Sequence, residues 1–486
     1  MRKLILLLFL PFYLSAQQPG EKVVGETSVK IDQYLTQLAK ERNYSGGLLI
    51  LKNGETIFSK GYGWANREEK IPFTSATLGS MGSITKAFTA AGILKLYQNK
   101  KLKLTDPLKK FFPTVLADKQ NITIHQLLTH SGGFVEFLAG DQGDFEKIET
   151  EEYLKRTFSQ PLAFTPGTKA VYTNVGMSLL GIIIEKVSGL DYESFLRLEL
   201  FLPNKIQSIG YQFPTTAGLF IAHGYQSGKD WGTHPLRYEK AGGGPYWNLK
   251  ANGGLEASLD DMARWANAIT NKKLLADSLL TKMFNPQILE EGYDGNSSFG
   301  YGCNISKSRR GTKMIDNGGS NGIYHARMIR LPEEGLIFYM ITNENAINTN
   351  QVLPNVTQLY FDGTIARDFT ALKFDHPQKN KLYDLLIQND PSKFESLLKE
   401  KNLKIEDDMI LLDVGQRLIE ENKLNEAVAL YRYYTTEFPN IIVAWNDLGE
   451  TYLQQGNKPE AKKCFEKALQ LRPGNPRATE NLKKMN

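Results

Sequence analysis

The feature that most constrains the fold is a self-similarity with a period of 34 residues near the end of the 486-residue chain. One window places small, large and helix-breaking residues at Trp445, Leu448, Gly449, Tyr452, Ala461, Phe465, Ala468 and Pro473. Moving back 34 residues from six of these gives a second set: Gly415, Leu418, Ala427, Tyr431, Tyr434 and Pro439. A sequence with this period folds as stacked helical hairpins, because each unit buries its apolar face only against its neighbours.

These positions resemble the tetratricopeptide repeat, in which small residues let two helices approach and aromatic residues fill the groove between them. We therefore expect an all-α repeat domain over residues 406–486, with a last helix, Arg477–Met485, capping the stack. Residues 363–405 are interpreted as a helical connector, in which 378–405 is a possible degenerate first unit. Two complete units rarely stand alone, so the repeats are expected to pack on the rest of the chain or on a protein partner.

The N-terminus has the three regions of a secretory leader. Basic residues, Arg2 and Lys3, precede an apolar run from Leu4 to Leu14, and the small residues Ser15 and Ala16 follow. The run is too short to span a bilayer comfortably, although an uncleaved anchor is the alternative. We expect a signal peptide at residues 1–16, an exported periplasmic or secreted protein, and no integral membrane segment after cleavage.

The region between the leader and the repeats mixes strand and helix patterns. Two apolar runs flank Asn53-Gly54, which predicts a hairpin. Helical spacing marks five segments, one before the hairpin and four after it: Ile31–Arg42, 83–98, 124–129, Val175–Ser188 and Ser258–Ile269. The segment 318–344 alternates as two strands around Pro332–Gly335. This order predicts an α+β domain over residues 28–362, an antiparallel sheet flanked by helices, and not a doubly wound parallel sheet.

Composition excludes several classes of function. The formal charge is +5, from 58 basic and 53 acidic residues, and no long basic block is present, so nucleic acid is not an expected partner. The two cysteines, Cys303 and Cys464, fall in different predicted domains and are expected to be free and buried. Four of the six histidines, His223, His234, His325 and His376, are scattered without ligand spacing, so neither a metal nor a cofactor is predicted.

Ser83 and Lys86 are the first candidates for chemistry. They open the helix after the first strands, and residues three apart share a helix face, so the hydroxyl and the amine can meet. A serine needs a base to take its proton, and a desolvated lysine can serve as that base. Taken alone, the pair also fits a capping serine and an exposed lysine.

Tyr172-Thr173-Asn174 is the second candidate element. Residues two apart in an extended loop point the same way, so Tyr172 and Asn174 could both face Ser83. A phenol can relay a proton, and an amide can hold a substrate carbonyl. As an isolated tripeptide, it equally fits a buried structural tyrosine.

Together these elements resemble the serine β-lactamase-like family, which includes class C β-lactamases, D-alanyl-D-alanine carboxypeptidases, D-aminopeptidases and esterases. The resemblance covers roughly residues 30–362 and extends to supporting stretches in family order at 124–133, 164–168, 253–262 and 331–335. It implies that Ser83 is the acylated nucleophile, Lys86 its base, Tyr172 the proton relay and Asn174 a substrate contact. It also implies an all-helical subdomain beside the sheet, with the site between them. His125 and His130, in one of these stretches, are expected to be structural.

The third family motif is where the sequence departs. The family places Lys-Thr-Gly or His-x-Gly on a strand lining the site, and the matching stretch begins Asp316-Asn317-Gly318-Gly319-Ser320. With Asp316 in the cation's place, a substrate carboxylate would be repelled, so β-lactams are expected to be poor substrates. Gly319 matches the residue whose N–H, with that of Ser83, binds the oxyanion, and Gly318 and Ser320 complete the predicted substrate-binding set. Two alternatives stay open: Asp316 points away from the site, or the register is shifted.

Residues 318–322 also fit Gly-x-Ser-x-Gly, but a strand follows where that motif needs a helix, so the match is interpreted as accidental. Trp231, Tyr246 and Trp247 are candidates for the pocket wall, with ordinary packing as the alternative. The leading hypothesis is a serine hydrolase acting through an acyl-enzyme on small-molecule or peptide acyl substrates. The rival hypothesis is a catalytically silent binding protein that uses its repeats for protein interaction.

Overall fold

The computed structural model describes residues 21–226, 229–292, 295–345, 347–365, 377–405 and 408–485. The chain passes from a first compact unit into a second between Thr364 and Ile365. The predicted signal peptide lies outside the described residues. None of the helices in the described ranges is long and apolar enough to cross a membrane.

A nine-stranded antiparallel sheet, counted over the described residues, forms the centre of the first unit. Its strands, in spatial order, are β1 (Lys22–Val23), β3 (Glu55–Tyr62), β2 (Gly46–Lys52), β15 (Leu336–Thr342), β14 (His325–Leu331), β13 (Lys313–Ser320), β12 (Asn304–Lys307), β11 (Ser297–Phe299) and β10 (Ile288–Leu289). The predicted hairpin is β2–β3, and Asn53 and Gly54 in its turn have the positive φ values, 51° and 82°, that such a turn requires. The predicted α+β class is confirmed.

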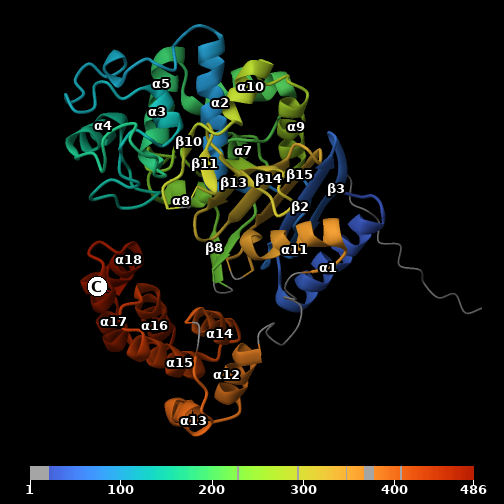
Figure 1. Ribbon diagram of the computed structural model, residues 1–486, viewed down its shortest axis with the longest axis vertical. Coiled ribbons are helices and arrows are strands. Elements are labelled where there is room, and N and C mark those ends of the chain that lie inside the picture. Colours follow the sequence, from blue (N-terminus) through green and yellow to red (C-terminus); the bar gives the residue numbers. More distant parts are fainter. Residues whose placement is uncertain are drawn as a thin grey trace, which may run out of the picture. The chain divides into compact units, whose positions relative to one another are not determined.

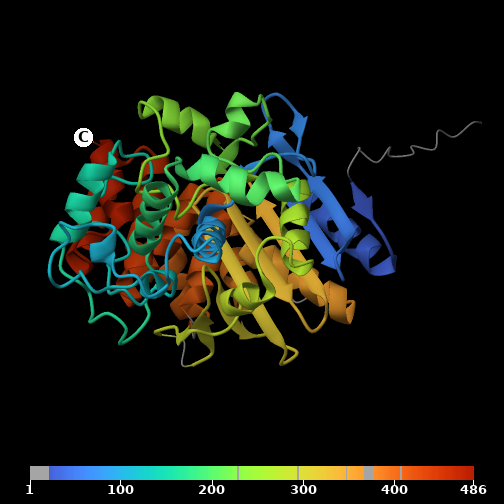
Figure 2. The same ribbon diagram turned by 90° about the horizontal axis from the view of Figure 1, so that it is seen from above.

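Helices cover both faces of this sheet (Figure 1 and Figure 2). One face packs on α1 (Glu26–Arg42) and α11 (Thr349–Asp362), where Phe338 of β15 meets Tyr360 edge to face. The other face carries the main apolar core, which it shares with α2 (Thr85–Gln98), α5 (Asn174–Ser188) and α9 (Leu259–Thr270). Because side chains alternate along a strand, the residues of β13 divide between these two environments.

The segment between β6 (Gly79–Ser80) and β9 (Glu256–Ala257) forms the predicted helical subdomain, which is not all-helical as predicted, because two short paired strands lie near its end. Its other helices are α3 (Ile124–Leu128), α4 (Thr150–Ser159), α6 (Tyr192–Leu196), α7 (Phe213–Thr216) and α8 (His234–Lys240). Short strands complete the unit at β4 (Trp64–Asn66), β5 (Ile71–Pro72), β7 (Gly224–Gln226) and β8 (Lys229–Gly232), and α10 (Asp277–Met283) follows α9. Helix α2 is buried almost all round, so Ser83 and Lys86 sit at the start of a rigid element.

The segment 318–344 differs from the sequence prediction in one respect. Residues up to Ser320 belong to an additional strand, β13, and only the later residues form the two expected strands, β14 and β15. The missed feature is the turn between β13 and β14, where the Asn321 side chain accepts hydrogen bonds from the N–H groups of Ile323 and Tyr324. Asn-Gly pairs favour such turns, and Gly322 has a φ of 81°.

The second unit consists of paired helices around one apolar core. Its helices are α12 (Pro377–Ile387), α13 (Phe394–Glu400), α14 (Met409–Glu420), α15 (Leu424–Glu437), α16 (Ile442–Gln454), α17 (Lys458–Leu471) and α18 (Pro476–Met485). A Cβ placed on Gly415 would lie 2.4 Å from the Tyr431 ring, and one on Gly449 would lie 2.6 Å from the Phe465 ring. These two contacts are 34 residues apart, so the same close approach of two helices is repeated. The cysteines are free and buried, Cys303 in the first unit and Cys464 in the second, as the sequence predicted.

Candidate active site

Ser83 lies in a single 3₁₀ turn, Gly82–Ile84, which leads directly into α2. The N–H of Ser83 precedes the first hydrogen bond of this turn, which Ile84 N donates to the Met81 carbonyl oxygen, so the Ser83 N–H is available to a developing negative charge. Gly82 has a φ of 51°, and a Cβ there would lie 2.5 Å from the backbone nitrogen of Ser320. A glycine is therefore required where β13 closes against the serine turn.

Lys86 is buried, with 3% of its surface exposed, one helical turn after Ser83. Its Nζ lies 3.0 Å from Ser83 Oγ, 2.7 Å from Asn174 Oδ1 and 2.6 Å from the carbonyl oxygen of Asn252. Burial lowers the pKa of Lys86 from 10.5 to about 7. Near neutral pH, the side chain therefore exists partly as the free amine.

The three contacts of Lys86 also orient it. An ammonium has three N–H bonds, and two of them are taken by the oxygens of Asn174 and Asn252, so the third points at Ser83 Oγ. When the ammonium loses a proton, the two N–H bonds that point to the oxygens of Asn174 and Asn252 remain. The lone pair then faces the Ser83 hydroxyl, which is the geometry that a general base needs.

Tyr172 completes the contacts to Ser83. Its hydroxyl donates to Ser83 Oγ at 2.7 Å, and its ring lies 4.7 Å from Lys86 Nζ. Burial raises the pKa of Tyr172 well above the ordinary value, so the phenol keeps its proton at neutral pH. The structure thus brings Lys86 and Tyr172 to Ser83 Oγ, and Asn174 to Lys86 Nζ.

His130 supports the tyrosine from behind. Its ring stacks on Tyr172 at 5.0 Å, and its Nδ1 accepts a hydrogen bond from the N–H of Thr173 at 3.2 Å. Burial, reinforced by the nearby charge of Lys86, lowers the pKa of His130 to about 3, so the ring is neutral. His125, the other histidine of this stretch, lies 2.8 Å from the Tyr301 hydroxyl.

Two carboxylates that were not predicted from the sequence, those of Glu136 and Asp144, affect the pKa of Lys86. Glu136, exposed, and Asp144, half-buried, both favour the charged form of Lys86 and so raise its pKa, against the larger effect of burial. They come from the loop between α3 and α4, which Asn248 fastens through hydrogen bonds to Asp141 and Glu146. No short motif marks them, because only the folded loop brings them near Lys86.

Asp316 is not brought to Ser83. It forms a two-point ion pair with Arg327 of β14, with Nη2 to Oδ2 at 2.6 Å and Nε to Oδ1 at 3.1 Å. Its cross-strand partner, Ile329, pairs in turn with Phe338, whose ring contacts α11. Asp316 therefore lies on the α1/α11 face of the sheet, and Gly318 and the Ser320 side chain share that face.

The opposite face of β13 carries Asn317 and Gly319. A Cβ on Gly319 would lie 1.9 Å from the carbonyl oxygen of Met81 and 2.8 Å from the nitrogen of Ser83, so this position faces the serine turn. Asn317 is 7% exposed and donates from Nδ2 to the carbonyl oxygen of Gly302 at 2.6 Å. The tripeptide that lines the site is thus Asn317-Gly318-Gly319, and a neutral amide stands where the family has a cation.

The register also identifies which backbone N–H faces Ser83. Asn321 N donates to the Tyr324 carbonyl oxygen, and Ser320 pairs with His325 next to it. Hydrogen-bonded pairs alternate along an antiparallel ladder, so the N–H of Gly319 points to β14 and that of Ser320 points away from it. The Ser320 N–H, and not that of Gly319, therefore lies on the open edge of β13 beside Gly82.

Residues 318–322 form a strand and a turn that lead into β14, so the Gly-x-Ser-x-Gly match lacks the helix it needs.

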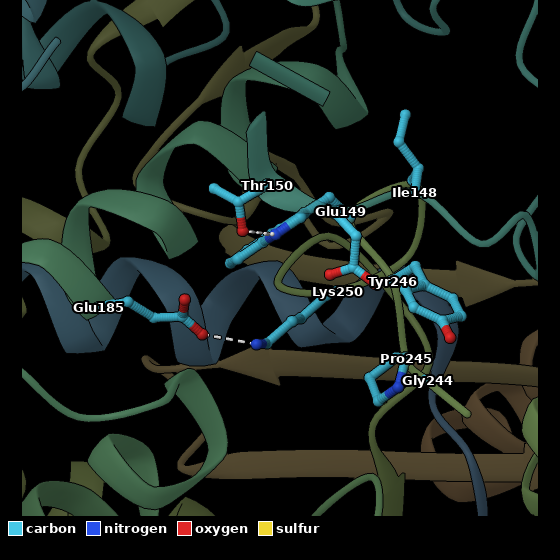
Figure 3. A pocket seen from close by; sticks show the side chains of 9 residues that line it. Ile148, Glu149, Thr150, Glu185, Gly244, Pro245, Tyr246 and Lys250 are labelled. Carbon is cyan, nitrogen blue, oxygen red and sulfur yellow. Dashed lines mark hydrogen bonds and ion pairs between the residues drawn. The ribbon is translucent and has the colours of Figure 1, made fainter. Parts of the chain in front are cut away.

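The aromatic residues predicted to wall the pocket lie elsewhere. Trp247 is buried and donates from Nε1 to Thr150 Oγ1, while Trp231 packs against Phe145 and Tyr324. Tyr246 and Trp247 line a separate pocket of about 250 Å³. Figure 3 shows Tyr246 in this pocket with Lys250, which pairs with Glu185. Glu185, which lines this pocket, lies 11 residues beyond Asn174 on α5, so the two side chains are anchored about 16 Å apart along the helix. The pocket is therefore distinct from the site around Ser83.

The profile of the beta-lactamase family matches residues 31–356, about two thirds of the chain. The chain belongs to this family. A tetratricopeptide repeat profile matches residues 442–475. The beta-lactamase family resemblance and the repeats predicted from the sequence are both confirmed.

Relatives of this beta-lactamase family member include proteins with different named activities. The chain is 28% identical over 259 residues to "Putative penicillin-binding protein PbpX" of Bacillus subtilis (strain 168), covering 53% of this chain and 63% of that protein. It is 27% identical over 305 residues to "D-aminopeptidase" of Gluconobacter oxydans (strain 621H), covering 61% and 55%. In both cases, the match spans less than two thirds of the relative's own length.

Among solved structures, the octameric penicillin-binding protein homologue from Pyrococcus abyssi shares the fold. Its TM-score is 0.61 at 24% identity, covering 74% of this chain and 81% of that chain. The family is one of hydrolases of the penicillin-binding protein and β-lactamase fold, with esterase and peptidase relatives.

Proposed function

We propose that this protein is a serine hydrolase that forms an acyl-enzyme on Ser83 and transfers the acyl group to water. The observation that carries the proposal is the pair of hydrogen bonds that Ser83 Oγ receives from Lys86 and Tyr172. Lys86, as the free amine, takes the proton of Ser83 as Oγ attacks the acyl carbon. The resulting oxyanion accepts hydrogen bonds from the N–H groups of Ser83 and Ser320.

Collapse of this intermediate breaks the bond to the leaving group, which needs a proton. Tyr172, with its hydroxyl on Ser83 Oγ and its ring against Lys86, passes a proton from the Lys86 ammonium to the leaving atom. Water then attacks the ester on Ser83, the same groups act in reverse, and the free acid departs. Asn174, whose Oδ1 is held by Lys86, offers its Nδ2 to a substrate carbonyl.

Tyr172→Phe tests the relay. The phenyl ring keeps the stacking on His130 but lacks the hydroxyl, so we expect kcat to fall about 100-fold with little change in KM. Tyr246→Phe is a matched control, because its hydroxyl lies in the separate pocket and contacts the carbonyl oxygen of Gly242. An unchanged kcat in Tyr172→Phe would assign the leaving-group proton to another donor.

The proposed substrates are neutral or cationic acyl compounds. Asn317 supplies no positive charge on the site-facing side of β13, and the carboxylates of Glu136 and Asp144 lie near Lys86. A carboxylate-bearing β-lactam gains no ion pair here, whereas an ester or an aminoacyl compound needs none. We expect higher kcat/KM for p-nitrophenyl esters or D-amino acid p-nitroanilides than for nitrocefin, all measured on one preparation. Preferential turnover of nitrocefin would overturn this substrate class.

Asn317→Lys restores the missing cation and tests the same point. Because a charge-assisted hydrogen bond to a carboxylate contributes roughly 1.5–3 kcal/mol, we expect kcat/KM for nitrocefin to rise about tenfold or more, with esters little changed. Asp316→Asn is the matched control on the neighbouring position, whose side chain faces Arg327, so we expect no gain. A gain in Asp316→Asn alone would place Asp316, and not Asn317, in the site.

The rival hypothesis of a catalytically silent binding protein was based on Asp316, an acid where the third family motif has a cation. Because Asp316 pairs with Arg327 on the far face of the sheet, that observation no longer favours it. The repeats of the second unit support protein interaction as an additional role.

Export is also proposed, from the basic, apolar and small-residue regions of residues 1–16. A mature chain beginning at Gln17, measured by intact mass, is the expected result.

A further inference from the structure

Two buried side chains, His234 and Glu256, and the partly buried Asn321, none of which the proposed mechanism uses, link the two sides of the oxyanion position. His234 is 0% exposed and Glu256 is 1% exposed, and His234 Nδ1 lies 3.2 Å from Glu256 Oε1. On its other side, His234 Nε2 lies 2.6 Å from Asn321 Nδ2. Within the described residues, neither the Glu256 carboxylate oxygens nor His234 Nδ1 makes a hydrogen bond of good geometry, so the two side chains are linked by this close polar contact.

The neighbours of Asn321 fix the direction of each hydrogen bond. Its Oδ1 is held by two backbone N–H groups, those of Ile323 at 3.1 Å and Tyr324 at 2.9 Å, which can only donate. The amide nitrogen must therefore face His234, and Nε2 must accept from it. The ring proton then sits on Nδ1, which makes a close polar contact of 3.2 Å with Glu256 Oε1 without reaching hydrogen-bond geometry. This order of donors and acceptors allows one tautomer of a neutral imidazole.

The two ends of this chain belong to the two walls beside Ser83. Glu256 lies on β9 and pairs with Ser80 of β6, three residues before Ser83. Asn321 directly follows Ser320, whose N–H faces the serine turn. A Cβ on Gly82 would lie 2.5 Å from the Ser320 nitrogen and 2.9 Å from the Gly319 carbonyl carbon, so the walls touch at this point.

We propose that His234 is a positioning residue: with Glu256 and Asn321 it ties β9 to the end of β13 and holds the Ser320 N–H at the oxyanion position. The inference rests on the proposed acyl-enzyme function, because the position of the Ser320 N–H relative to the Ser83 N–H matters only if the two groups bind an oxyanion. Small shifts of an oxyanion donor are costly, because its benefit depends on placement before the reaction begins.

The test combines three variants with one matched control. His234→Gln keeps an acceptor near the Nε2 position, whereas Asn321→Ala removes the donor to His234 from a partly exposed turn. The pair His234→Leu with Glu256→Leu removes the link without leaving a buried unpaired carboxylate. His223→Leu is the control, because His223 also pairs with a carboxylate, Asp230 at 3.0 Å, but is not linked to β13 by that contact.

Each variant is measured for kcat and KM on a p-nitrophenyl ester, for melting temperature, and for the inhibition constant of a boronic acid. A boronic acid forms a tetrahedral adduct with the serine and so reports on the oxyanion position. We expect kcat to fall about 10- to 100-fold in Asn321→Ala and in the Leu pair, with little change in KM and a parallel loss of boronic acid affinity. His223→Leu is expected to stay within about threefold of the wild type, whereas His234→Gln, which keeps the acceptor for Asn321 but loses the N–H toward Glu256, is expected to fall between His223→Leu and the Leu pair.

Two outcomes separate this inference from the proposed function. If the wild type neither hydrolyses esters nor binds the boronic acid, the acyl-enzyme proposal fails, and the positioning role falls with it. If the wild type is active but Asn321→Ala and the Leu pair keep its kcat and boronic acid affinity, the positioning role alone is overturned. A lower melting temperature with unchanged kinetics would likewise assign the three residues to stability only.

Discussion

Ser83→Ala is expected to abolish covalent labelling by a fluorophosphonate and to lower ester hydrolysis by about four orders of magnitude. In the labelling reaction, Oγ attacks phosphorus and fluoride leaves, so the probe reports on an activated serine oxygen. We expect the alanine variant to keep the fold, because the hydrogen bonds of the serine side chain in the described part of the chain are those with Lys86 and Tyr172. A residual rate over water would come from the backbone N–H groups and from substrate binding.

The chain offers a matched control for the same chemistry. Ser396 and Lys399 have the identical spacing on α13, where Ser396 is exposed and donates to the carbonyl oxygen of Lys393. Ser396→Ala should therefore retain full labelling and full activity. Loss of labelling in Ser396→Ala, or its persistence in Ser83→Ala, would mean that another serine is the nucleophile. Loss of labelling in Ser396→Ala would also show that the Ser-x-x-Lys spacing makes a serine reactive even where the pair is not buried.

The central groups of the site could be predicted from the sequence because local geometry brings them close. Ser83 and Lys86 share a helix face, and Tyr172 and Asn174 lie two apart in an extended segment before α5. Their meeting around Ser83 Oγ and Lys86 Nζ needed the fold, and the resemblance to a family supplied that information. The repeats were predictable for a related reason, since glycine and aromatic positions recur at a fixed spacing along the chain.

The third motif shows why the rest could not be predicted. A shift of one residue in a strand moves every side chain to the other face, so the role given to Asp316 depended wholly on register. A signal was present: Gly319 must face the serine turn, and Asn317, two residues earlier, then shares its face. The carbonyl of Asn252 and the carboxylate of Asp144 carried no such signal, because a backbone oxygen has no residue type and a loop position has no fixed spacing.

The pH dependence of the reaction follows from Lys86. Burial lowers its pKa from 10.5 to about 7, and the free amine is the form that accepts the Ser83 proton. Below this pKa the ammonium dominates and the base is lost, so kcat/KM should fall as the pH is lowered, with a midpoint near 7. Above it, activity should stay on a plateau, because the Tyr172 phenol keeps its proton well into the alkaline range. A midpoint near 10 would show that Lys86 is protonated at rest.

Lys86→Met tests whether this acidic limb belongs to the lysine. Methionine approximates the length of the side chain but cannot take a proton, so we expect kcat/KM to fall about 1,000-fold, within the usual range for a general base, and the limb near pH 7 to vanish from the residual rate. Persistence of the limb in Lys86→Met would assign it to another group. His130 does not serve as that group, because burial holds its pKa at about 3.

Asp144→Asn is expected to shift the midpoint of the acidic limb of kcat/KM, in a direction set by the charges of Asp144 and Lys86. The Asp144 carboxylate stabilises the ammonium of Lys86 and raises its pKa, so its neutral amide should shift the midpoint to lower pH, and Glu136→Gln should do the same. Glu149→Gln, an exposed acid that lines the separate pocket, should leave the midpoint unchanged. A shift to higher pH in Asp144→Asn would contradict the sign of this interaction. Because the shift concerns an equilibrium of the free enzyme, it must appear in kcat/KM for a neutral ester, whose own charge does not change with pH.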